Sequence, residues 1–424
     1  MKFAFVTPRY GAEFGTGAEH ACRLLAEQIA KRHDVDVLTT TARDSTTWKN
    51  DYSEGADRVR GALVRRFAVT AAFEGDRFAE LSRRLREGPR TRPDELAWVR
   101  LLGPSSSGLL EHLKRQYRAY DALVFFGLWH RLTVSGLEIA PDRSVLFPYL
   151  QLRPELRFDL WADVLRLPRA VGYFSSSERR LVHSYVGTIP QYEELIGIGV
   201  DPPPRQTYPR HQQDPADVIT ADDEAAGDEE LPLEEGYLAG RGVPFRRRHR
   251  LYDNFALYGG RVEPDNGCEQ MLEYFDSFAA DRVDDMSLVL MGVKMMTVPE
   301  APYLRLAGVL PDRERMTAYE AASVTIAPAS DDLLAQSLLE SLAVGTPVLA
   351  NAGNEAAVEH CRRANGGLYY SNREEFVGAL VQLRAPSLRE RLGENGRRYI
   401  RHNHQWDAVI GRFERLVGRV RRTA

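Results

Sequence analysis

Short apolar runs alternate with longer amphipathic stretches along most of the chain. In the first half, apolar runs at 3–7, 35–40, 122–127 and 144–149 are separated by helical patterns such as 18–32. Apolar runs that alternate with helical segments are typical of βαβ units and of a parallel sheet. The pattern therefore predicts an α/β domain whose first strand is the run at 3–7.

The same alternation restarts in the second half. Apolar runs at 254–260, 286–292 and 323–329 are separated by helical patterns at 268–280 and 313–322. Because single cores stop growing at roughly 250 to 300 residues, a chain of 424 residues is expected to form two domains. The fold class predicted is α/β, with two Rossmann-like domains.

The composition changes sharply between the two halves. Residues 201–250 combine a Pro-rich stretch, an acidic block at 222–230 and the basic run "RRRHR" at 246–250. Such strongly charged, Pro-rich segments bury little apolar surface, so an insertion between the domains is expected. The domains predicted are a first domain at 1–200, a charged insertion at 201–250, a second domain at 251–400 and a C-terminal crossing helix at 401–424.

The chain ends in two helical patterns that break near Asn403. The second pattern has an apolar face that includes Trp406 and Phe413, and an opposite face of four arginines, Arg412, Arg415, Arg419 and Arg421. An amphipathic helix of this kind either packs on the protein with its polar face outward or docks on a membrane surface. The pattern favours a terminal helix that packs across the two domains.

Charge and cysteine content narrow the classes of function. A formal net charge of −4 gives no sign of nucleic-acid binding, and a basic run beside an acidic block is typical of a solvated loop. The three cysteines, Cys22, Cys268 and Cys361, lack the paired spacing of a disulfide framework or zinc site. We therefore expect a cytoplasmic protein without a bound metal.

Membrane contact, if present, is expected to be peripheral, because no window approaches the roughly 20 apolar residues of a spanning helix. A stretch with five arginines lies near Leu81, Leu85 and Trp98, namely Arg83, Arg84, Arg86, Arg90 and Arg92. These arginines either form a solvated helix face, which the pattern favours, or contact anionic lipid at the inner face of the membrane.

The stretch "SDDLLAQSLLESLAVGTPVLANAGN" holds one acid that needs an explanation. Its helical pattern begins near Gln336, and Gly345 and Pro347 end the helix before a strand at 348–350. Glu340 lies among leucines of that helix, and a carboxylate near an apolar face needs a polar partner. A pair of ligand hydroxyls is one such partner.

A second motif lies about seventy residues earlier in the chain. Gly259, Gly260 and Arg261 end the apolar run at 254–260, and Gly267 precedes the next helical pattern. Glycine lets a backbone approach a ligand closely, and the planar guanidinium of arginine suits phosphate oxygens. Both motifs fall at C-terminal strand ends, where open α/β sheets bind ligands.

Together these motifs resemble those of the GT-B glycosyltransferases of retaining family 4. The shared features are Gly260 and Arg261, then Asn266 and Gly267, then Asp332 and Glu340 eight residues apart, then "LAVGTPVLA". The first residues, "VTPRYGAEFGTGAEH", resemble the family's first strand and glycine loop, and apart from 201–250 the resemblance covers nearly the whole chain. It implies two Rossmann-like domains that face across a cleft, with a C-terminal helix that crosses back to the first domain.

The resemblance implies a role for each residue of these motifs. The backbone at Gln336, Ser337 and Leu338 would hold the diphosphate of a nucleotide-sugar donor at the positive end of the helix. Arg261, beside Gly260, would bind the same phosphates, and Glu340 would accept hydrogen bonds from the ribose hydroxyls. Asp332 would face the donor sugar and stabilise the positive charge that develops at its anomeric carbon. Gly17 matches the N-terminal glycine loop, close to the donor phosphates and the acceptor.

Three residues depart from the family pattern. Asn266 replaces a lysine, which keeps a hydrogen-bond donor but removes a positive charge from the diphosphate site. Asp332 is one methylene shorter than the family's glutamate. Gln151 lies where many relatives have a histidine near the reacting centre, and an amide cannot act as a general base.

The sequence thus predicts a retaining, metal-independent hexosyltransferase that needs no cofactor beyond its donor. It would move a sugar from a UDP- or GDP-linked donor to a hydroxyl of a sugar or lipid-linked acceptor, in cell-envelope, polysaccharide or glycolipid biosynthesis. The alternative is a degenerate GT-B protein that serves as a nucleotide-binding or partner subunit. A nicotinamide oxidoreductase is disfavoured because "VTPRYGAEFGTG" lacks the compact Gly-x-Gly-x-x-Gly fingerprint. The donor base and sugar, the acceptor and the oligomeric state stay open.

Overall fold

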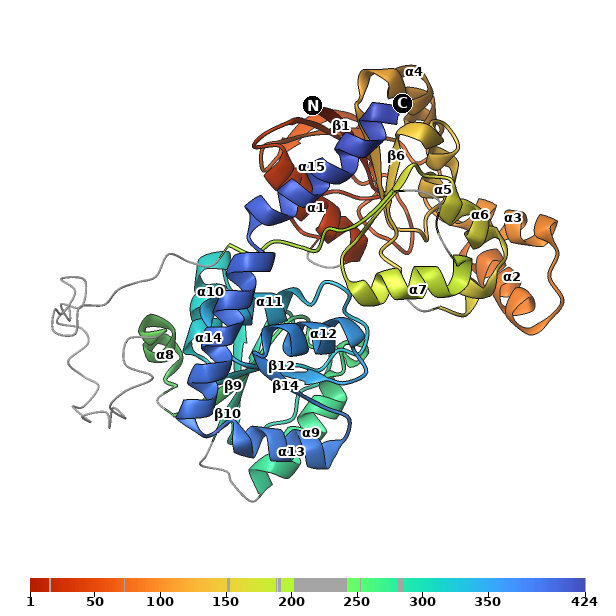
Figure 1. Cartoon of the computed structure of the whole chain (residues 1–424). Helices are drawn as coiled ribbons and strands as arrows, with labels where there is room; N and C mark the ends of the chain where they lie inside the picture. The colour runs from red at the N-terminus through yellow and green to blue at the C-terminus, as the bar shows by residue number, and fades with distance from the viewer. Residues whose placement is uncertain are drawn as a thin grey trace. The chain divides into compact units, whose positions relative to one another are not determined.

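The structure is a computed structural model that divides into two compact units. The first unit is Met1–Gly199 with His404–Ala424, and the second is Val200–Asn403. The residues that the structure describes are 1–14, 17–71, 73–150, 153–187, 189, 192–201, 242–251, 253–280 and 286–423. Figure 1 shows both units, with the helices and several of the strands labelled.

The first unit is built on an eight-stranded sheet of order β3-β4-β2-β1-β5-β6-β7-β8. Its strands pair in parallel except for β3, which forms an antiparallel pair with β4 at the edge. The strands are β1 Lys2–Val6, β2 Asp34–Thr40, β3 Gly55–Val59, β4 Ala62–Phe67, β5 Ala122–Phe126, β6 Ser144–Phe147, β7 Ala170–Tyr173 and β8 Tyr192–Leu195. The helices are α1 Gly17–Ile29, α2 Gly75–Glu87, α3 Arg92–Leu101, α4 Ser107–Gln116, α5 Arg131–Leu137, α6 Leu160–Arg166, α7 Ser176–Val186 and α15 Trp406–Thr423.

The second unit is built on a six-stranded, fully parallel sheet of order β11-β10-β9-β12-β13-β14. The strands are β9 Phe255–Gly259, β10 Ser287–Met291, β11 Leu304–Gly308, β12 Val324–Ala327, β13 Val348–Asn351 and β14 Gly367–Tyr370. The helices are α8 Val243–His249, α9 Cys268–Ala280, α10 Asp312–Ala321, α11 Gln336–Val344, α12 Glu355–Ala364, α13 Arg373–Gln382 and α14 Pro386–Asn403.

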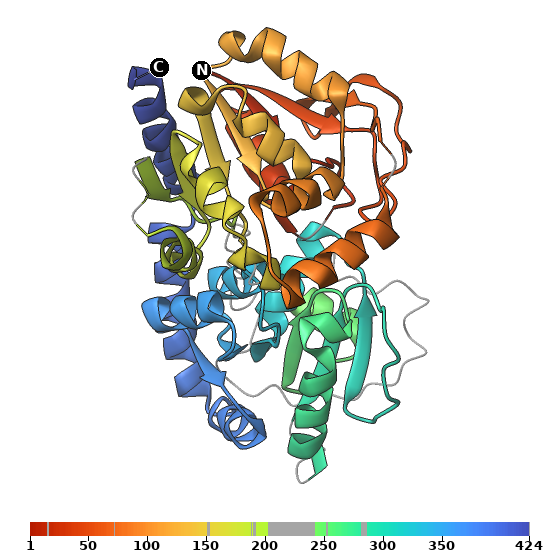
Figure 2. The same ribbon diagram turned by 90° about the vertical axis from the view of Figure 1, so that its right-hand side faces the viewer.

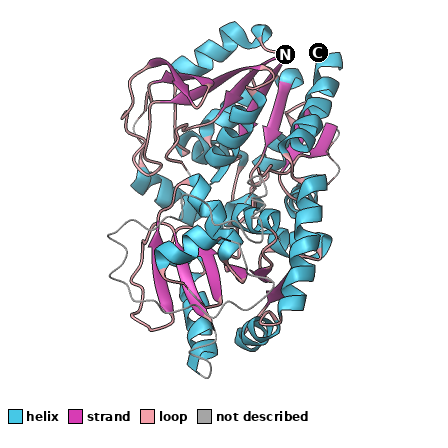
Figure 3. Ribbon diagram, turned by 90° about the vertical axis from the view of Figure 1, so that its left-hand side faces the viewer, coloured by secondary structure: helices cyan, strands magenta, loops and turns pink. Residues whose placement is uncertain are grey.

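Successive residues of the central strands serve two different cores, which explains the continuous apolar runs. In β9, Ala256 and Tyr258 pack into a core with α9 and α13, whereas Phe255 and Leu257 pack into a core with α8 and α10. Strands that are buried on both faces need apolar residues at every position. Each sheet therefore lies between layers of helices (Figure 3), and the predicted fold class of two Rossmann-like α/β domains is confirmed.

The last helix, α15, belongs to the first unit, so the chain returns to the unit in which it began. Phe413 lies 5.4 Å from Phe3 and 6.0 Å from Phe5 between ring centroids, and the helix packs along β7 and β8 (Figure 2). Its arginines are bound to the same unit: Arg412 donates to the Ile196 carbonyl at 2.9 Å, and Arg421 pairs with Asp121 at 3.2 Å. The predicted return of the C-terminal helix to the first domain is confirmed, and its basic face contacts that unit.

The predicted insertion at 201–250 needs a correction at its C-terminal end. Residues 202–241, with the acidic block, lie outside the described residues. The basic run, however, lies largely in helix α8, where Phe245 and Leu251 are buried in a core of the second unit. Arg246 donates to the carbonyl of Asp253 at 2.9 Å, and Arg248 pairs with Glu314 at 2.8 Å. Phe245 and Leu251 flank the basic run and are buried, so residues 242–251 belong to the folded second unit and not to an insertion.

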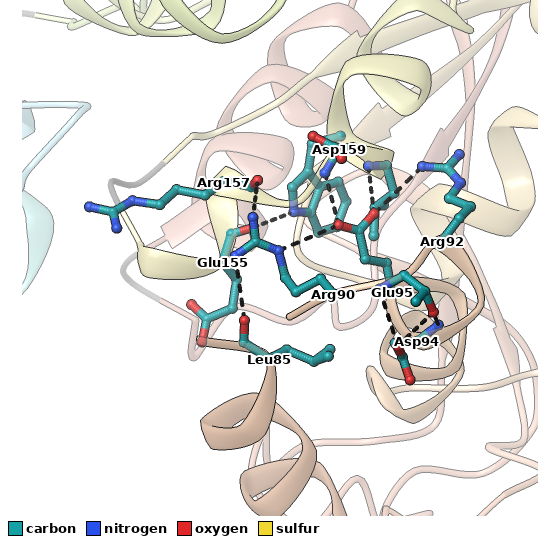
Figure 4. A network of polar contacts seen from close by, with 11 residues as sticks. Leu85, Arg90, Arg92, Asp94, Glu95, Glu155, Arg157 and Asp159 are labelled. Carbon is teal, nitrogen blue, oxygen red and sulfur yellow. Dashed lines mark hydrogen bonds and ion pairs between the residues drawn. The ribbon is translucent and has the colours of Figure 1, made fainter. Parts of the chain in front are cut away.

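The arginines near Trp98 are held by carboxylates within the first unit (Figure 4). Glu95 is buried, and Arg90 and Arg92 lie 3.8 and 3.7 Å from its oxygens. Arg92 also pairs with Asp163 at 2.6 Å, and Arg86 donates to buried Glu155 at 2.6 Å. These cations stabilise the contacts of α2 with the turn Pro154–Arg157 and of α3 with α6, which supports the interpretation as a helix face over a lipid-binding one.

Candidate active site

Three loops meet at the carboxyl edge of the second sheet because β9, β12 and β13 are adjacent and parallel. Two asparagines hold the loop that follows β12. Asn351 donates from Nδ2 to the Pro328 carbonyl at 3.0 Å. Asn354 donates from Nδ2 to the carbonyls of Ala329 and Asp332, at 3.2 and 3.1 Å. The position of Asp332 is therefore fixed by the turn that follows β13.

The turn after β9 presents Arg261. Its carbonyl accepts hydrogen bonds from Tyr258 Oη at 2.7 Å and Asn266 Nδ2 at 2.9 Å. The guanidinium is about half exposed, with 48% of the side chain accessible, and pairs with Glu263 at 2.9 Å. Gly260, which precedes it, is exposed and donates its N–H to a carbonyl of β10.

Asn266 has a different environment from the one that the family pattern implied. Its Nδ2 donates to the Arg261 carbonyl and, at 3.0 Å, to Glu263 Oε1. An amide nitrogen carries two hydrogens, and these two contacts engage both. Asn266 therefore stabilises the turn that presents Arg261, and a phosphate would have to displace one of these bonds to reach it.

Asp332 organises the start of helix α11. Its Oδ1 accepts from the N–H groups of Leu334 and Ala335, each at 3.1 Å. Ala335 takes a left-handed conformation, with φ +46°, which costs a residue with a side chain about 1 to 2 kcal/mol. Burial raises the pKa of Asp332, and the two N–H groups oppose that rise. The Asp332 carboxyl thus stabilises a strained backbone turn at the N-terminus of helix α11.

Glu340 has a protein partner that the sequence did not reveal. The residue is 4% exposed, and Arg315 of α10 donates from one nitrogen to Oε1 at 2.6 Å and also to Oε2. Gln336, one turn earlier on α11, donates from Nε2 to Oε1 at 2.9 Å. The requirement for a polar partner was correct, and Arg315 and Gln336 meet it within the chain.

Tyr319 of α10 connects the strand end to both acids. A side chain at Gly259 would lie 2.2 Å from the Tyr319 hydroxyl, so only glycine fits there. Burial raises the pKa of Tyr319, and the negative charges of Glu340 and Asp332 add to that rise. The two predicted acids therefore lie near one phenol at one edge of the sheet.

The other two predicted backbone contacts lie in the first turn of α11. Ser337 is partly exposed, whereas Leu338 is fully buried, so Leu338 can offer a ligand its N–H group and not its side chain. Residue Ala335, which precedes the helix, makes no side-chain capping bond to it. A helix start without a side-chain cap suits an anion.

The remaining predicted residues belong to the first unit. Gly17 begins α1 with φ +81°, a conformation that residues with side chains rarely adopt. Gln151 lies outside the described residues. The residue before it, Leu150, donates its N–H to Glu178 at 3.0 Å. Burial raises the pKa of Glu178 to about 7, although backbone N–H groups such as that of Phe174 oppose the rise.

The carboxyl ends of β1 and β5 carry polar side chains that the sequence analysis did not select. Arg9 pairs with Glu19 at 2.9 Å, and His130 packs edge-on against Trp48 with ring centroids 6.2 Å apart. Burial lowers the pKa of His130. The strand order of the sheet reverses between β1 and β5, which is where open α/β sheets bind ligands.

Two further features concern metals and membranes. Among the described residues, no group of three or more His, Cys, Asp or Glu side chains is arranged to hold a metal ion. Within the same part of the chain, every helix is too short or too polar to cross a bilayer.

Comparison with known proteins adds to this geometry. Residues 244–399 match the family described as "Glycosyl transferases group 1". Over 87 residues the chain is 31% identical to "Glycosyltransferase 1 domain-containing protein 1" of Xenopus tropicalis, a match that covers 20% of this chain and 24% of that relative.

Two solved structures are similar over almost the full chain. Sucrose-phosphate synthase from Thermosynechococcus elongatus superposes with a TM-score of 0.66 at 14% identity and covers 100% of both chains. HepE of Anabaena, in complex with UDP and glucose, superposes with a TM-score of 0.63 at 12% identity and covers 99% of each chain.

Proposed function

We propose that the chain is a retaining glycosyltransferase, because residues 244–399 match the glycosyl transferases group 1 family and the chain has the GT-B fold. It moves a hexose from a UDP- or GDP-linked donor to a hydroxyl of a sugar or lipid-linked acceptor, in cell-envelope, polysaccharide or glycolipid biosynthesis. The donor binds at the carboxyl edge of the second unit, and the acceptor is taken by the first unit, without a resident metal.

The observation that carries this proposal is the convergence of a buried acid and an uncapped helix start at one sheet edge. Glu340 lies one turn into α11, and the N–H groups of Ser337 and Leu338 lie in the first turn. A nucleoside diphosphate carries its diphosphate and its 2′,3′-diol on the same ribose, so a single ligand can contact the helix start and the acid together. Arg261, from the adjacent strand β9, provides a cation for the phosphates.

In the proposed reaction the bond between the anomeric carbon and the diphosphate oxygen breaks, and a bond to the acceptor oxygen forms. The nucleoside diphosphate leaves with the electron pair of the broken bond and takes up the proton of the acceptor hydroxyl. Asp332 stabilises the positive charge that develops on the sugar. Its carboxylate must be ionised for this, and since burial raises its pKa, activity is expected to fall as the pH is lowered.

A thermal-shift panel of nucleoside diphosphates tests donor binding. At least one member should raise the melting temperature of the unsubstituted protein, because ligands that bind the folded state stabilise it. Glu340→Ala and Arg261→Ala should each remove the shift, while the exposed residues Glu390 and Arg305 supply matched control substitutions to alanine. Absence of a shift with every nucleotide would overturn the proposal.

Turnover separates the enzyme from a degenerate nucleotide-binding subunit. The engagement of Asn266 within its own turn favours the degenerate alternative, because the diphosphate site then lacks the family's lysine charge. Mass spectrometry of a donor and acceptor screen should detect transfer or slow donor hydrolysis, and Asp332→Asn should reduce it about a hundredfold. Binding without any turnover would support the subunit instead.

A further inference from the structure

We infer that Arg315 is a positioning residue for the donor site: it keeps Glu340 charged and oriented, so ribose binding depends on a residue that does not touch the donor. The inference rests on the proposed function and goes beyond it, because it assigns the control of Glu340 to helix α10. Arg315 belongs to none of the motifs by which the sequence pointed to nucleotide-sugar binding.

The contact itself is close and asymmetric in burial. One guanidinium nitrogen of Arg315 reaches both oxygens of Glu340, with 2.6 Å to Oε1. The Arg315 side chain is 30% exposed, whereas that of Glu340 is 5% exposed. The cation is therefore the more exposed partner of the pair, and it compensates the charge of the buried acid.

A charged carboxylate at this depth would otherwise favour its neutral, protonated form. The same chain provides an example: Glu178 is buried and accepts hydrogen bonds from backbone N–H groups, and its pKa is raised to about 7. A protonated Glu340 would be a weaker acceptor for hydroxyl donors. Since a carboxylate has about four acceptor positions, contacts with Arg315 and Gln336 are compatible with further bonds from a diol.

Charge balance at the edge of the sheet supports the same role. A nucleoside diphosphate is an anion, and it would enter a site that already holds the acids Asp332 and Glu340. Asn266 supplies no charge there, while Arg315 brings one directly onto Glu340. Pairing of the acid with a cation reduces its repulsion of the incoming diphosphate.

The other described groups near Glu340 are neutral, acidic or bonded elsewhere. Tyr319, also on α10, is buried and its pKa is raised in part by Glu340, so it stays neutral. Asp332 is an acid, and Gln336 on α11 is neutral. Arg397 on α14, the helix packed against α11, donates to the Val344 carbonyl at the opposite end of α11. In the part of the chain that the structure describes, Arg315 is thus a cation in direct contact with the acid.

The test compares Arg315→Met with Arg315→Lys, and uses Arg313→Met as the control on the same helix, since Arg313 is exposed. Affinity for the nucleoside diphosphate that stabilises the unsubstituted protein is measured by calorimetric titration at about pH 6.5 and about pH 8.5. The same titrations are repeated with its 2′-deoxy counterpart, which lacks one hydroxyl of the diol.

We expect Arg315→Met to bind the nucleotide about tenfold more weakly at about pH 6.5 and to recover most of that loss at about pH 8.5. Its preference for the ribose over the deoxyribose nucleotide should disappear at the lower pH. Arg315→Lys should keep most of the affinity, and Arg313→Met should match the unsubstituted protein. A misfolded variant would not recover its nucleotide affinity at high pH. This recovery therefore distinguishes a positioning role of Arg315 from a merely structural one.

Two results would overturn the inference. If Glu340→Ala abolishes binding but Arg315→Met binds normally at both pH values, the inference fails while the proposed function stands. If Arg315→Met loses affinity equally at both pH values and for both nucleotides, Arg315 acts on the phosphates or on folding, and the inference also fails. If the unsubstituted protein binds no nucleotide, the proposed function is overturned first.

Discussion

Glu95 in the first unit and Glu340 in the second are both buried acids with arginine neighbours, yet their hydrogen-bond partners differ in kind. Glu95 accepts from the backbone N–H groups of Asp159 and Leu160, at 3.0 and 2.9 Å, where helix α6 begins (Figure 4). Glu340 accepts from the side chains of Arg315 and Gln336.

This difference separates a structural acid from a candidate binding acid. The N–H groups at the start of α6 cannot leave Glu95 unless the helix unwinds or shifts. Side chains such as Gln336, in contrast, can rotate away when a ligand hydroxyl takes their place. Burial and an adjacent arginine are therefore insufficient to identify an acid that binds a ligand. Such an acid is identified by hydrogen-bond partners that can move and by its position at the carboxyl ends of strands.

The largest effect is expected for Glu95→Ala. The substitution leaves two N–H groups at the start of α6 without their acceptor and the charge of Arg90 without its carboxylate, which should cost about 3 to 5 kcal/mol of unfolding free energy. Urea unfolding measures this cost. Alanine in place of Glu80, an exposed acid on α2, is the control. Equal stability of the two variants would contradict the structural role of backbone partners.

His360 sharpens the comparison, because its hydrogen-bond partner is a side chain but lies between two packed helices. It bonds Tyr399 at 2.9 Å, and burial lowers its pKa from 6.5 to about 4. Between pH 6.5 and about pH 4, the unfolded chain binds a proton at His360 that the folded chain does not bind. Lowering the pH through this range therefore destabilises the fold, by about 2 kcal/mol at about pH 5.

Urea unfolding at several pH values measures this loss. His360→Gln should flatten the pH dependence, whereas His402→Gln, at an exposed position of α14, should not. Nucleotide affinity should be unchanged in both variants. A loss of nucleotide affinity in His360→Gln would contradict this comparison, because it would place the His360–Tyr399 pair in the ligand site although it lies between two packed helices.

The smallest effect is expected for Arg86→Ala. Arg86 pairs with Glu155, whose side chain is 7% exposed, but Arg86 itself is 49% exposed, so solvent screening limits the loss of stability to about 1 kcal/mol. Arg77→Ala on the same helix removes a pair in which both partners are exposed, and should cost less. Both variants should co-sediment with anionic vesicles as the unsubstituted protein does. A drop for Arg86→Ala alone would restore the lipid-binding interpretation.

The sheets were predictable because strands buried on both faces leave continuous apolar runs in the sequence. The edge hairpin of β3 and β4 was missed, since β3 is exposed except at Val59 and shows no apolar pattern. Helix α8 was missed for a related reason: Phe245 and Leu251 are separated by the basic run, and their burial comes from contacts with distant strands.

The candidate site was predictable in its motifs and not in their partners. Short sequence motifs contain Asp332, Glu340 and Arg261, so these residues could be recognised from the sequence alone. Arg315 on α10, Asn351 at the end of β13 and Asn354 beyond it reach the site from other strand–helix units, and a single arginine in an amphipathic helix has no distinguishing pattern. The arginines near Trp98 were ambiguous because their carboxylates, such as Glu155, lie far away in the sequence.

The placement of α15 has a consequence for the order in which the protein can be made. The apolar surface around Phe3 and Phe5 is covered by Phe413, which is synthesised some 400 positions later. All of the second unit leaves the ribosome before that cover is available. Most of the first unit is thus translated before the second unit, yet its interior is closed later, and until then its aromatic face is open to water or to a chaperone.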